Sequence, residues 1–235
     1  MNLQNLFITT NFLYIVEHLN IVLTESALEI LPDELKKNSK SYNIDHKFLD
    51  KSYHSHLMKN LDNIDKRGRP DIVHMSSLSI TSTPLYLENQ IKYYIHTISD
   101  HVIELDFGVR LPKSYHRFIG LFEKLFHNYL NNEESDPLIN IYESSFSELM
   151  SDIDSDHVVG LSRQGDSLSS NYLSDKIINS SSPTLLIGGF SHGTFSKNVL
   201  TCIDDLISLG NFNLESHTAC SRIIYEIEKH NPNFS

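Results

Sequence analysis

Short blocks of apolar residues alternate with polar stretches along the chain, and most blocks have the length of a β-strand. β-Branched and aromatic residues are frequent in these blocks, and turn residues bound them, which is typical of strands. The expected strands are 20–25, 71–82, 91–98, 101–107 and 138–145, and the first parts of 158–166, 182–193 and 205–230. The strand 71–82 is expected to end in a turn at Thr83 and Pro84.

The clearest helix is expected over residues 115–130, where apolar residues recur three and four positions apart and so share one face. These residues are Phe118, Leu121, Phe122, Leu125, Phe126 and Tyr129. We also expect a short helix before Pro32, helical fragments and loop over 33–66, and a terminal helix up to residue 230. Strands and helices alternate without an internal repeat, which predicts an α/β fold.

The length of 235 residues fits one large domain, or one domain with a modest extension, and 40% hydrophobic residues are enough for a sizeable core. No apolar run approaches the ~18–20 residues of a membrane-spanning helix. The apolar start of the chain lacks the features of a signal peptide. Cys202 and Cys220 lack a metal-ligand spacing, so we expect a reduced, cytoplasmic protein with no metal and no membrane partner.

The formal net charge of −11 by itself argues against a nucleic-acid-binding protein. The positions of the arginines weaken this argument, because most of them lie between residues 67 and 117, together with Lys66 and Lys113. A locally basic patch on an acidic protein can still bind a phosphate backbone, since screening makes the attraction short-ranged.

Residues 184–196, TLLIGGFSHGTFS, place a glycine-rich turn directly after an apolar strand. The turn contains the G-x-S-x-G pattern of a hydrolase nucleophile elbow, with Ser191 as the nucleophile. The acids and bases that follow it are Asp204, Asp205, His217 and His230. They leave no room for the strands that normally separate the members of such a triad, so a hydrolase is disfavoured. Glycines let a ligand approach the backbone, so the loop suits an adenosyl or phosphate ligand, and a tight turn without a ligand is the remaining alternative.

Several segments stand in an order that is characteristic of one protein family. They read IVLTESALEILP, RGRPDIVHMSSLSITSTPL, YYIHT, VRLPKSYHRFIGL, IGGFSHGTFS and NFNLESHTACSRI. Together they resemble the ribosome-biogenesis methyltransferases that methylate N1 of a pseudouridine in small-subunit ribosomal RNA, in a form close to the archaeal one. The resemblance runs from about residue 21 to 228. Its R-P-D-I-V-H and R-x-P-K-x-x-x-R-F motifs are long and specific.

The resemblance implies a SPOUT-class domain over 21–235, with a mostly parallel central sheet flanked by helices and a C-terminal trefoil knot over about 158–235. Residues 1–20 would form an N-terminal extension. SPOUT relatives are dimers whose active site lies across the subunit boundary. The resemblance therefore implies a homodimer with twofold symmetry, with the cofactor loop of one chain near the arginines of the other. Two departures are that YLENQ at 86–90 replaces a small basic turn and that Lys113 stands where an arginine is common. Lysine keeps the charge but loses the bidentate fork.

The resemblance also assigns roles to charged residues. It implies that Arg69 contacts the ribosomal RNA and acts in catalysis with Asp71, which would fix the guanidinium plane through paired hydrogen bonds. Arg110, Lys113 and Arg117 are spaced three and four apart and converge as a phosphate track requires. An ordinary surface ion pair and a solvated basic face are the simpler alternatives for these two groups.

The implied cofactor is S-adenosyl-L-methionine. The residues expected to bind it are Gly188, Gly193, Leu209, Gly210, Asn211, Phe212, Asn213 and Leu214, and LSRQG at 161–165 is a further candidate loop. The implied activity is S-adenosylmethionine-dependent methylation of pseudouridine N1 in small-subunit ribosomal RNA. The alternative is a ribosomal-RNA-binding assembly factor whose main role is not catalytic.

Overall fold

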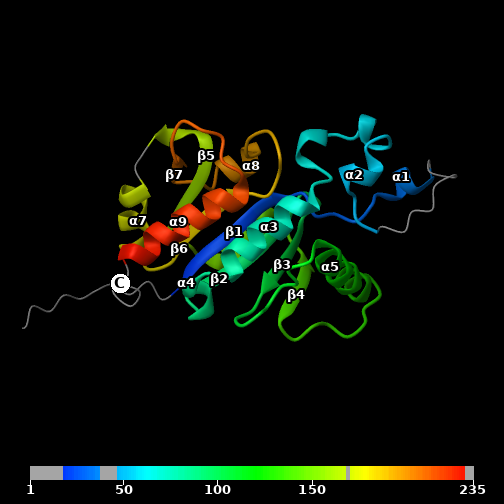
Figure 1. Cartoon of the computed structure of the whole chain (residues 1–235), viewed down its shortest axis with the longest axis horizontal. Coiled ribbons are helices and arrows are strands. Elements are labelled where there is room, and N and C mark those ends of the chain that lie inside the picture. Colours follow the sequence, from blue (N-terminus) through cyan, green and yellow to red (C-terminus); the bar gives the residue numbers. More distant parts are fainter. Residues whose placement is uncertain (1–17, 38–46, 168–169, 231–235) are drawn as a thin grey trace, which may run out of the picture.

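The computed structural model describes residues 18–37, 47–167 and 170–230, and its centre is one seven-stranded sheet in the order β4-β3-β2-β1-β6-β5-β7 (Figure 1). The strands are β1 (Leu19–Ser26), β2 (Ile91–Thr97), β3 (His101–Leu105), β4 (Ile139–Glu143), β5 (His157–Ser167), β6 (Pro183–Gly188) and β7 (Asp205–Ser208). The pairs among β2, β1, β6, β5 and β7 are parallel, and β3 is antiparallel to both β2 and β4. The expected α/β class with a mostly parallel sheet is therefore confirmed.

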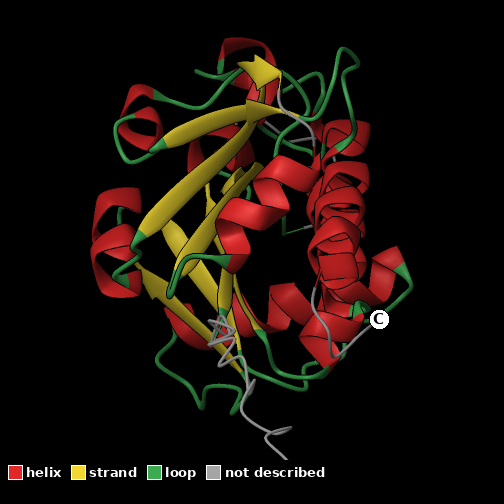
Figure 2. Ribbon diagram, turned by 90° about the vertical axis from the view of Figure 1, so that its left-hand side faces the viewer, coloured by secondary structure: helices red, strands yellow, loops and turns green. Residues whose placement is uncertain are grey.

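Helices cover both faces of the sheet (Figure 2). The α-helices are α1 (Asp33–Lys37), α2 (Lys51–His54), α3 (Pro70–Thr81), α4 (Pro84–Leu87), α5 (Tyr115–Leu130), α6 (Phe146–Ile153), α7 (Ser170–Ile178), α8 (Lys197–Leu200) and α9 (Ser216–His230), and Met58–Asn60 and Ile64–Lys66 are 3-10 helices. Buried side chains of α3, α5, α7 and α9 share one core with the sheet, and those of α6 and α8 share the other. None of the described helices is long and apolar enough to cross a membrane.

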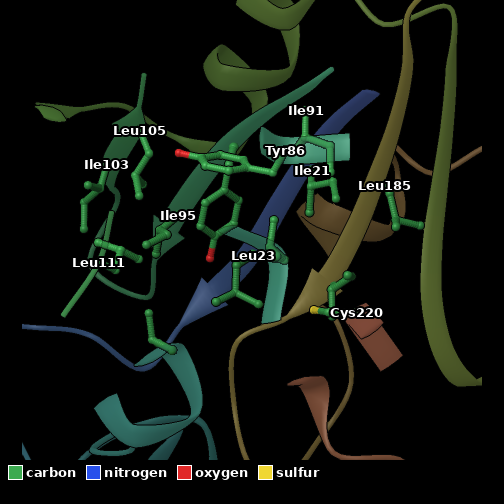
Figure 3. Close-up of a cluster of buried hydrophobic side chains, with 14 of the residues drawn as sticks. Ile21, Leu23, Tyr86, Ile91, Ile95, Ile103, Leu105, Leu111, Leu185 and Cys220 are labelled. Carbon is green, nitrogen blue, oxygen red and sulfur yellow. The ribbon is translucent and has the colours of Figure 1, made fainter. Parts of the chain in front are cut away.

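The central strand β1 is buried along its whole length, which is why its sequence does not alternate cleanly between apolar and polar residues. Ile21 and Leu23 point into the core under α3 and α9, and Val22 points into the core on the opposite face. Figure 3 shows the larger of the two cores, in which Tyr86 and Cys220 pack near these strands. The two-sided burial fixes the register, because a slip by one residue would exchange the faces of every side chain.

The segment 71–82 is a helix, so the expected strand at this place was wrong. Pro70 stands at the first position of α3 and Asp71 in its first turn, and both are favourable at a helix start. Eight of the twelve residues of α3 are buried, because α3 lies between the sheet, α5 and α9. A helix that is buried nearly all round shows no clear amphipathic period, which explains the mistaken assignment.

Other expectations differ in detail. The helix expected before Pro32 is absent, because Ile30 forms a β-bridge with Phe48 and the helix begins after the proline, at Asp33. The helix α6 was not anticipated, although Ser145 and Glu148 form a capping box at its start. The expected boundary between 20 and 21 falls inside β1. Residues 1–17 of the expected extension and residues 38–46 lie outside the described part of the chain.

Candidate functional site

The carboxyl ends of the parallel strands β5, β6 and β7 meet at one edge of the sheet and enclose a pocket of about 530 Å³. Three segments line it, which are 161–164 in β5, 187–195 from the end of β6 onward, and 207–219 from the end of β7 into α9. Ligands of open α/β sheets bind outside the carboxyl ends of the strands, and the volume falls within the roughly 300–1,000 Å³ typical of small-molecule sites.

The turn after β6 has the shape that its glycines permit. A Cβ on Gly189 would lie 2.8 Å from the Ser26 Cα, so only glycine lets this turn pack against the end of β1. Gly193 has a φ of +104°, in the region that favours glycine. The Gly188 carbonyl accepts a hydrogen bond of 2.6 Å from Ser216 Oγ, which ties the turn to the start of α9.

The expected cofactor residues lie at or beside this pocket. Those in its wall are Gly188, Gly193, Leu209, Phe212, Asn213 and Leu214. Gly210 and Asn211 stand in the same loop but do not line the pocket. The Phe212 side chain is 83% exposed, an unusual state for a large apolar ring and one that suits stacking against a bound ligand.

Ser191 does not have the surroundings of a hydrolase nucleophile. Its hydroxyl donates a hydrogen bond of 2.9 Å to the Asp65 carbonyl. Asp204 accepts the Val158 N–H at 2.8 Å, and Asp205 forms an ion pair with Lys176 that lowers the pKa of the Asp205 carboxyl. The two candidate acids are therefore engaged on the β5 side of the sheet, away from the Ser191 hydroxyl.

A buried ion pair joins the glycine turn to the segment that precedes α3. Lys66 Nζ lies 2.8 Å from Glu25 Oε2 and 4.6 Å from the centre of the Phe190 ring. The same carboxylate oxygen accepts the Ser196 N–H at 3.2 Å, and the Lys66 side chain packs against Gly193. Both members of the pair are nearly buried, with exposed side-chain fractions of 13% and 8%. Lys66 thus holds the turn after β6 against the 3-10 helix Ile64–Lys66.

Arg69 and Asp71 form a two-pronged ion pair at the start of α3. Arg69 Nε and Nη2 donate to Asp71 Oδ1 and Oδ2, each at 2.8 Å. Hydrogen bonding to Asp71 is the main cause that raises the pKa of Arg69, and the nearby Glu215 and Asp50 carboxylates add to it. Glu215 lines the pocket, so a carboxylate of the pocket wall acts on the Arg69 guanidinium of the same chain.

Arg110, Lys113 and Arg117 are exposed and lie before and within the first turn of α5. The loop that carries them is attached to α3, because His74 Nε2 donates a hydrogen bond of 2.9 Å to the Pro112 carbonyl. His74 also packs against Phe118, with 4.6 Å between ring centres. The two groups of cations thus come from elements that are in direct contact.

The model of the EMG1/NEP1 methyltransferase family matches residues 21–228. The chain belongs to this family. Among the family's proteins, the ribosomal RNA small subunit methyltransferase Nep1 of Staphylothermus marinus is 33% identical over 221 residues, which are 90% of this chain and 96% of that protein. The Nep1 of Sulfurisphaera tokodaii is 34% identical over 220 residues, 88% of this chain and 94% of that protein.

A solved EMG1/NEP1 structure has the same fold. The crystal structure of Archaeoglobus fulgidus Nep1 bound to S-adenosylhomocysteine aligns with a TM-score of 0.73 and 28% identity, over 90% of this chain and 98% of that one. The membership that the sequence motifs indicated is therefore confirmed. The trefoil knot stays a prediction.

Part of the pocket wall was not predicted from the sequence. The residues concerned are Ile187, Phe190, Thr194, Phe195, Ile207, Ser208, Glu215, Ser216 and Ala219. Ile187, Ile207 and Ser208 stand at the ends of β6 and β7, and the rule that parallel sheets bind ligands at their carboxyl ends could have found them. Lys66 was counted only as a basic residue, because a contact with the turn after β6 cannot be read from the sequence.

Proposed function

We propose that this chain methylates N1 of a pseudouridine in small-subunit ribosomal RNA with S-adenosyl-L-methionine as the methyl donor. The observation that carries the proposal is the position of Arg69. Its guanidinium is fixed by Asp71, and the Glu215 carboxylate of the pocket wall acts on it. Lys66, three residues before Arg69, contacts the Phe190 ring in the same wall. A pocket for the methyl donor and a cation for the RNA therefore adjoin in one chain of the EMG1/NEP1 family.

The pocket residues fit the proposed cofactor. Exposed backbone groups of the turns after β6 and β7 suit the edge of an adenine ring, and Leu209, Leu214 and Phe212 offer apolar contacts for its faces. Gly188 and Gly193 leave room for close approach to the backbone. Gly210 and Asn211 would act by shaping the loop between these contacts. The bound S-adenosylhomocysteine of the Archaeoglobus fulgidus Nep1 supports this assignment.

The RNA would lie across the cations. Arg110, Lys113 and Arg117 are exposed, and no carboxylate of the described residues forms an ion pair with them. They are available to phosphates, which position an RNA without reading its sequence. Arg69 would then contact the target nucleotide at the pocket mouth. Extruding a base from its stack costs roughly 2–4 kcal/mol, and the cost is lowest for an unpaired base in a loop.

The chemistry needs alignment more than activation. The cofactor supplies a methyl group on a sulfonium, so the carbon–sulfur bond that breaks leaves neutral S-adenosylhomocysteine. Pseudouridine N1 forms the new bond to carbon and loses its proton to solvent water. The role of the chain is to hold N1 in line with the methyl group, and alignment of this kind contributes up to about 7–11 kcal/mol. Arg69, held by Asp71, would stabilise the negative charge that develops on the base.

We further propose a homodimer with twofold symmetry. Met75 on α3, Leu87 on α4 and Tyr225 on α9 expose 45%, 59% and 59% of their surface, and α3 and α9 lie side by side on one face (Figure 1). A second copy would cover these apolar side chains. The reaction on ribosomal RNA would take place in the cytoplasm.

The test is transfer of labelled methyl from S-adenosylmethionine to two hairpin RNAs that differ only in pseudouridine or uridine at one loop position. We expect transfer to the pseudouridine hairpin alone. Equal transfer to both would contradict the N1 specificity. Tight binding of both without transfer to either would favour the assembly factor whose main role is not catalytic.

A further inference from the structure

A second, smaller pocket lies between the start of α3, the segment 47–54 and the first turns of α5. It shares no residue with the pocket at the strand ends. Its volume of about 200 Å³ is below the roughly 300–1,000 Å³ of pockets for larger ligands, so it suits a single flat ring system. Phe48, Tyr53 and Tyr115 contribute aromatic rings to its wall, and Asp50 and Glu123 contribute carboxylates.

The two carboxylates differ in whether an oxygen is left to accept a hydrogen bond from a ligand. Asp50 accepts the Ser52 N–H through Oδ1 and the Tyr115 hydroxyl through Oδ2, so both of its oxygens hold the pocket together. Glu123 accepts the Lys47 N–H through Oε1 at 2.8 Å, and no described residue forms a hydrogen bond with Oε2. The pocket therefore offers an aromatic surface and one carboxylate oxygen that can accept a hydrogen bond from a ligand.

The pocket lies directly beside the proposed RNA contacts. Pro70 stands in its wall, between Arg69 and Asp71. Asp50 is close enough to Arg69 to raise the pKa of that guanidinium. Lys113 and Arg117 are exposed on either side of Tyr115 in the sequence. Cations for phosphates thus lie beside an aromatic surface that carries a carboxylate acceptor, and proteins that bind single-stranded RNA combine phosphate contacts with aromatic stacking and hydrogen bonds to base edges.

We propose that this pocket binds the base of a nucleotide next to the methylated one and prefers cytosine or adenine to uracil. Splayed bases stack on aromatic side chains, and a glutamate accepts a hydrogen bond from the exocyclic amino group of cytosine or adenine. Uracil has a carbonyl oxygen at the equivalent position of cytosine, and this oxygen would face the Glu123 carboxylate without a proton between them. The proposal rests on the proposed RNA substrate and adds a source of sequence preference.

The test uses pseudouridine hairpins in which each loop neighbour of the target is varied in turn among the four bases. Binding is measured by fluorescence anisotropy and methylation by label transfer, with the full chain and its Tyr53→Ala and Glu123→Gln variants. Tyr172→Ala is the control, because Tyr172 is as exposed as Tyr53, at 47%, but lies on α7 at the opposite end of the molecule (Figure 1). Glutamine can still accept the Lys47 N–H, so Glu123→Gln tests the acceptor without removing that contact.

We expect the wild type to bind hairpins with cytosine or adenine at one neighbouring position more tightly than the uracil hairpin. Tyr53→Ala should weaken binding of the preferred hairpin by about 5- to 150-fold, the effect of losing one base stack. Glu123→Gln should reduce the preference over uracil, and Tyr172→Ala should change neither quantity.

Equal affinity for all neighbours, or a preference that survives Glu123→Gln unchanged, would overturn the proposal. Methylation that does not depend on the neighbouring base would contradict the proposed base pocket and leave the proposed function intact. Binding with the expected preference but without methylation would support the pocket and contradict the proposed function. Failure to bind any hairpin would contradict both the proposed base pocket and the proposed function.

Discussion

At the scale of single residues, Asp71 shows how local sequence positions a functional side chain. The proline before it favours the first position of α3, and an acidic residue in the first turn is favourable beside the free N–H groups of a helix. From there both carboxylate oxygens reach the Arg69 guanidinium, at 2.8 Å each. The two side chains are 36% and 42% exposed, so the pair contributes little to stability, and its geometry matters more than its energy.

Replacing Asp71 by asparagine should therefore lower activity without unfolding the protein. Asparagine has one acceptor oxygen in place of two, so Arg69 loses the bond that fixes its plane. We expect kcat/KM for a pseudouridine hairpin to fall by about 10- to 100-fold, as for a misplaced catalytic contact. The melting temperature should stay close to that of the wild type, because the pair is half-exposed. Full turnover by Asp71→Asn would exclude a role of Asp71 in positioning Arg69.

The residues of the site were predictable to different degrees. Motifs led to Arg69, Asp71 and the glycines of the turn after β6, because these residue types are restricted by chemistry or by backbone geometry. Glu215 and Phe190 were missed, because their place in the pocket depends on how α9 and the turn after β6 pack. Such contacts join segments that are far apart in the chain, and no local pattern encodes them.

At the scale of elements, α3 and α5 show when periodicity is informative. α5 has one apolar face and one solvent face, so its spacing of three and four was visible, and its bounds of Tyr115 and Leu130 agree with the prediction. α3 is covered by α5, α9 and the sheet, and its apolar residues surround the helix. The capping signals at Pro70 and Asp71 were better guides to α3 than its hydrophobic pattern.

Lys66 holds the turn after β6, which forms part of the pocket wall, so we predict that Lys66 helps to position the cofactor. Lys66→Met removes the partner of the buried Glu25, and Arg67→Met removes the partner of the buried Glu29 in the same segment. Losing one partner of a buried pair destabilises by about 3–5 kcal/mol, so both variants should melt earlier. Of these two residues, Lys66 but not Arg67 lies against the turn, beside Phe190 and Gly193. Lys66→Met alone should weaken S-adenosylhomocysteine binding, by about 5- to 150-fold.

Calorimetric titration with S-adenosylhomocysteine, well below both melting temperatures, separates the two effects. Arg67→Met is the matched control for lost stability, and Lys66→Arg should restore much of the affinity because it keeps the charge beside Glu25. Equal losses of affinity in Lys66→Met and Arg67→Met would mean that general destabilisation, and not the contact with the turn, weakens binding.

At the scale of the whole molecule, β1 divides the sheet into two functional halves. The parallel strands β6, β5 and β7 on one side of β1 form the pocket at their carboxyl ends. The antiparallel ladder of β2, β3 and β4 on the other side carries α5 and the exposed cations before it. The segment 64–71 connects the two halves, since Lys66 contacts the turn after β6 and Arg69 directly precedes α3. Within one chain, this segment therefore connects the wall of the proposed cofactor pocket to the residues proposed to contact the RNA.

This arrangement gives a prediction for the proposed homodimer. Arg69→Ala and Gly193→Val chains, each inactive, can be co-expressed with different tags and purified as the mixed dimer. The Glu215 carboxylate of the pocket wall acts on Arg69 of the same chain, so we expect each Arg69 to serve its own pocket. Each site of this dimer then lacks one component, and no methyl transfer is expected. If Arg69 instead served the pocket of the partner subunit, one site would be intact and the mixed dimer would have about half the wild-type rate. A mixed dimer of wild type and Gly193→Val should have that half rate and provides the control.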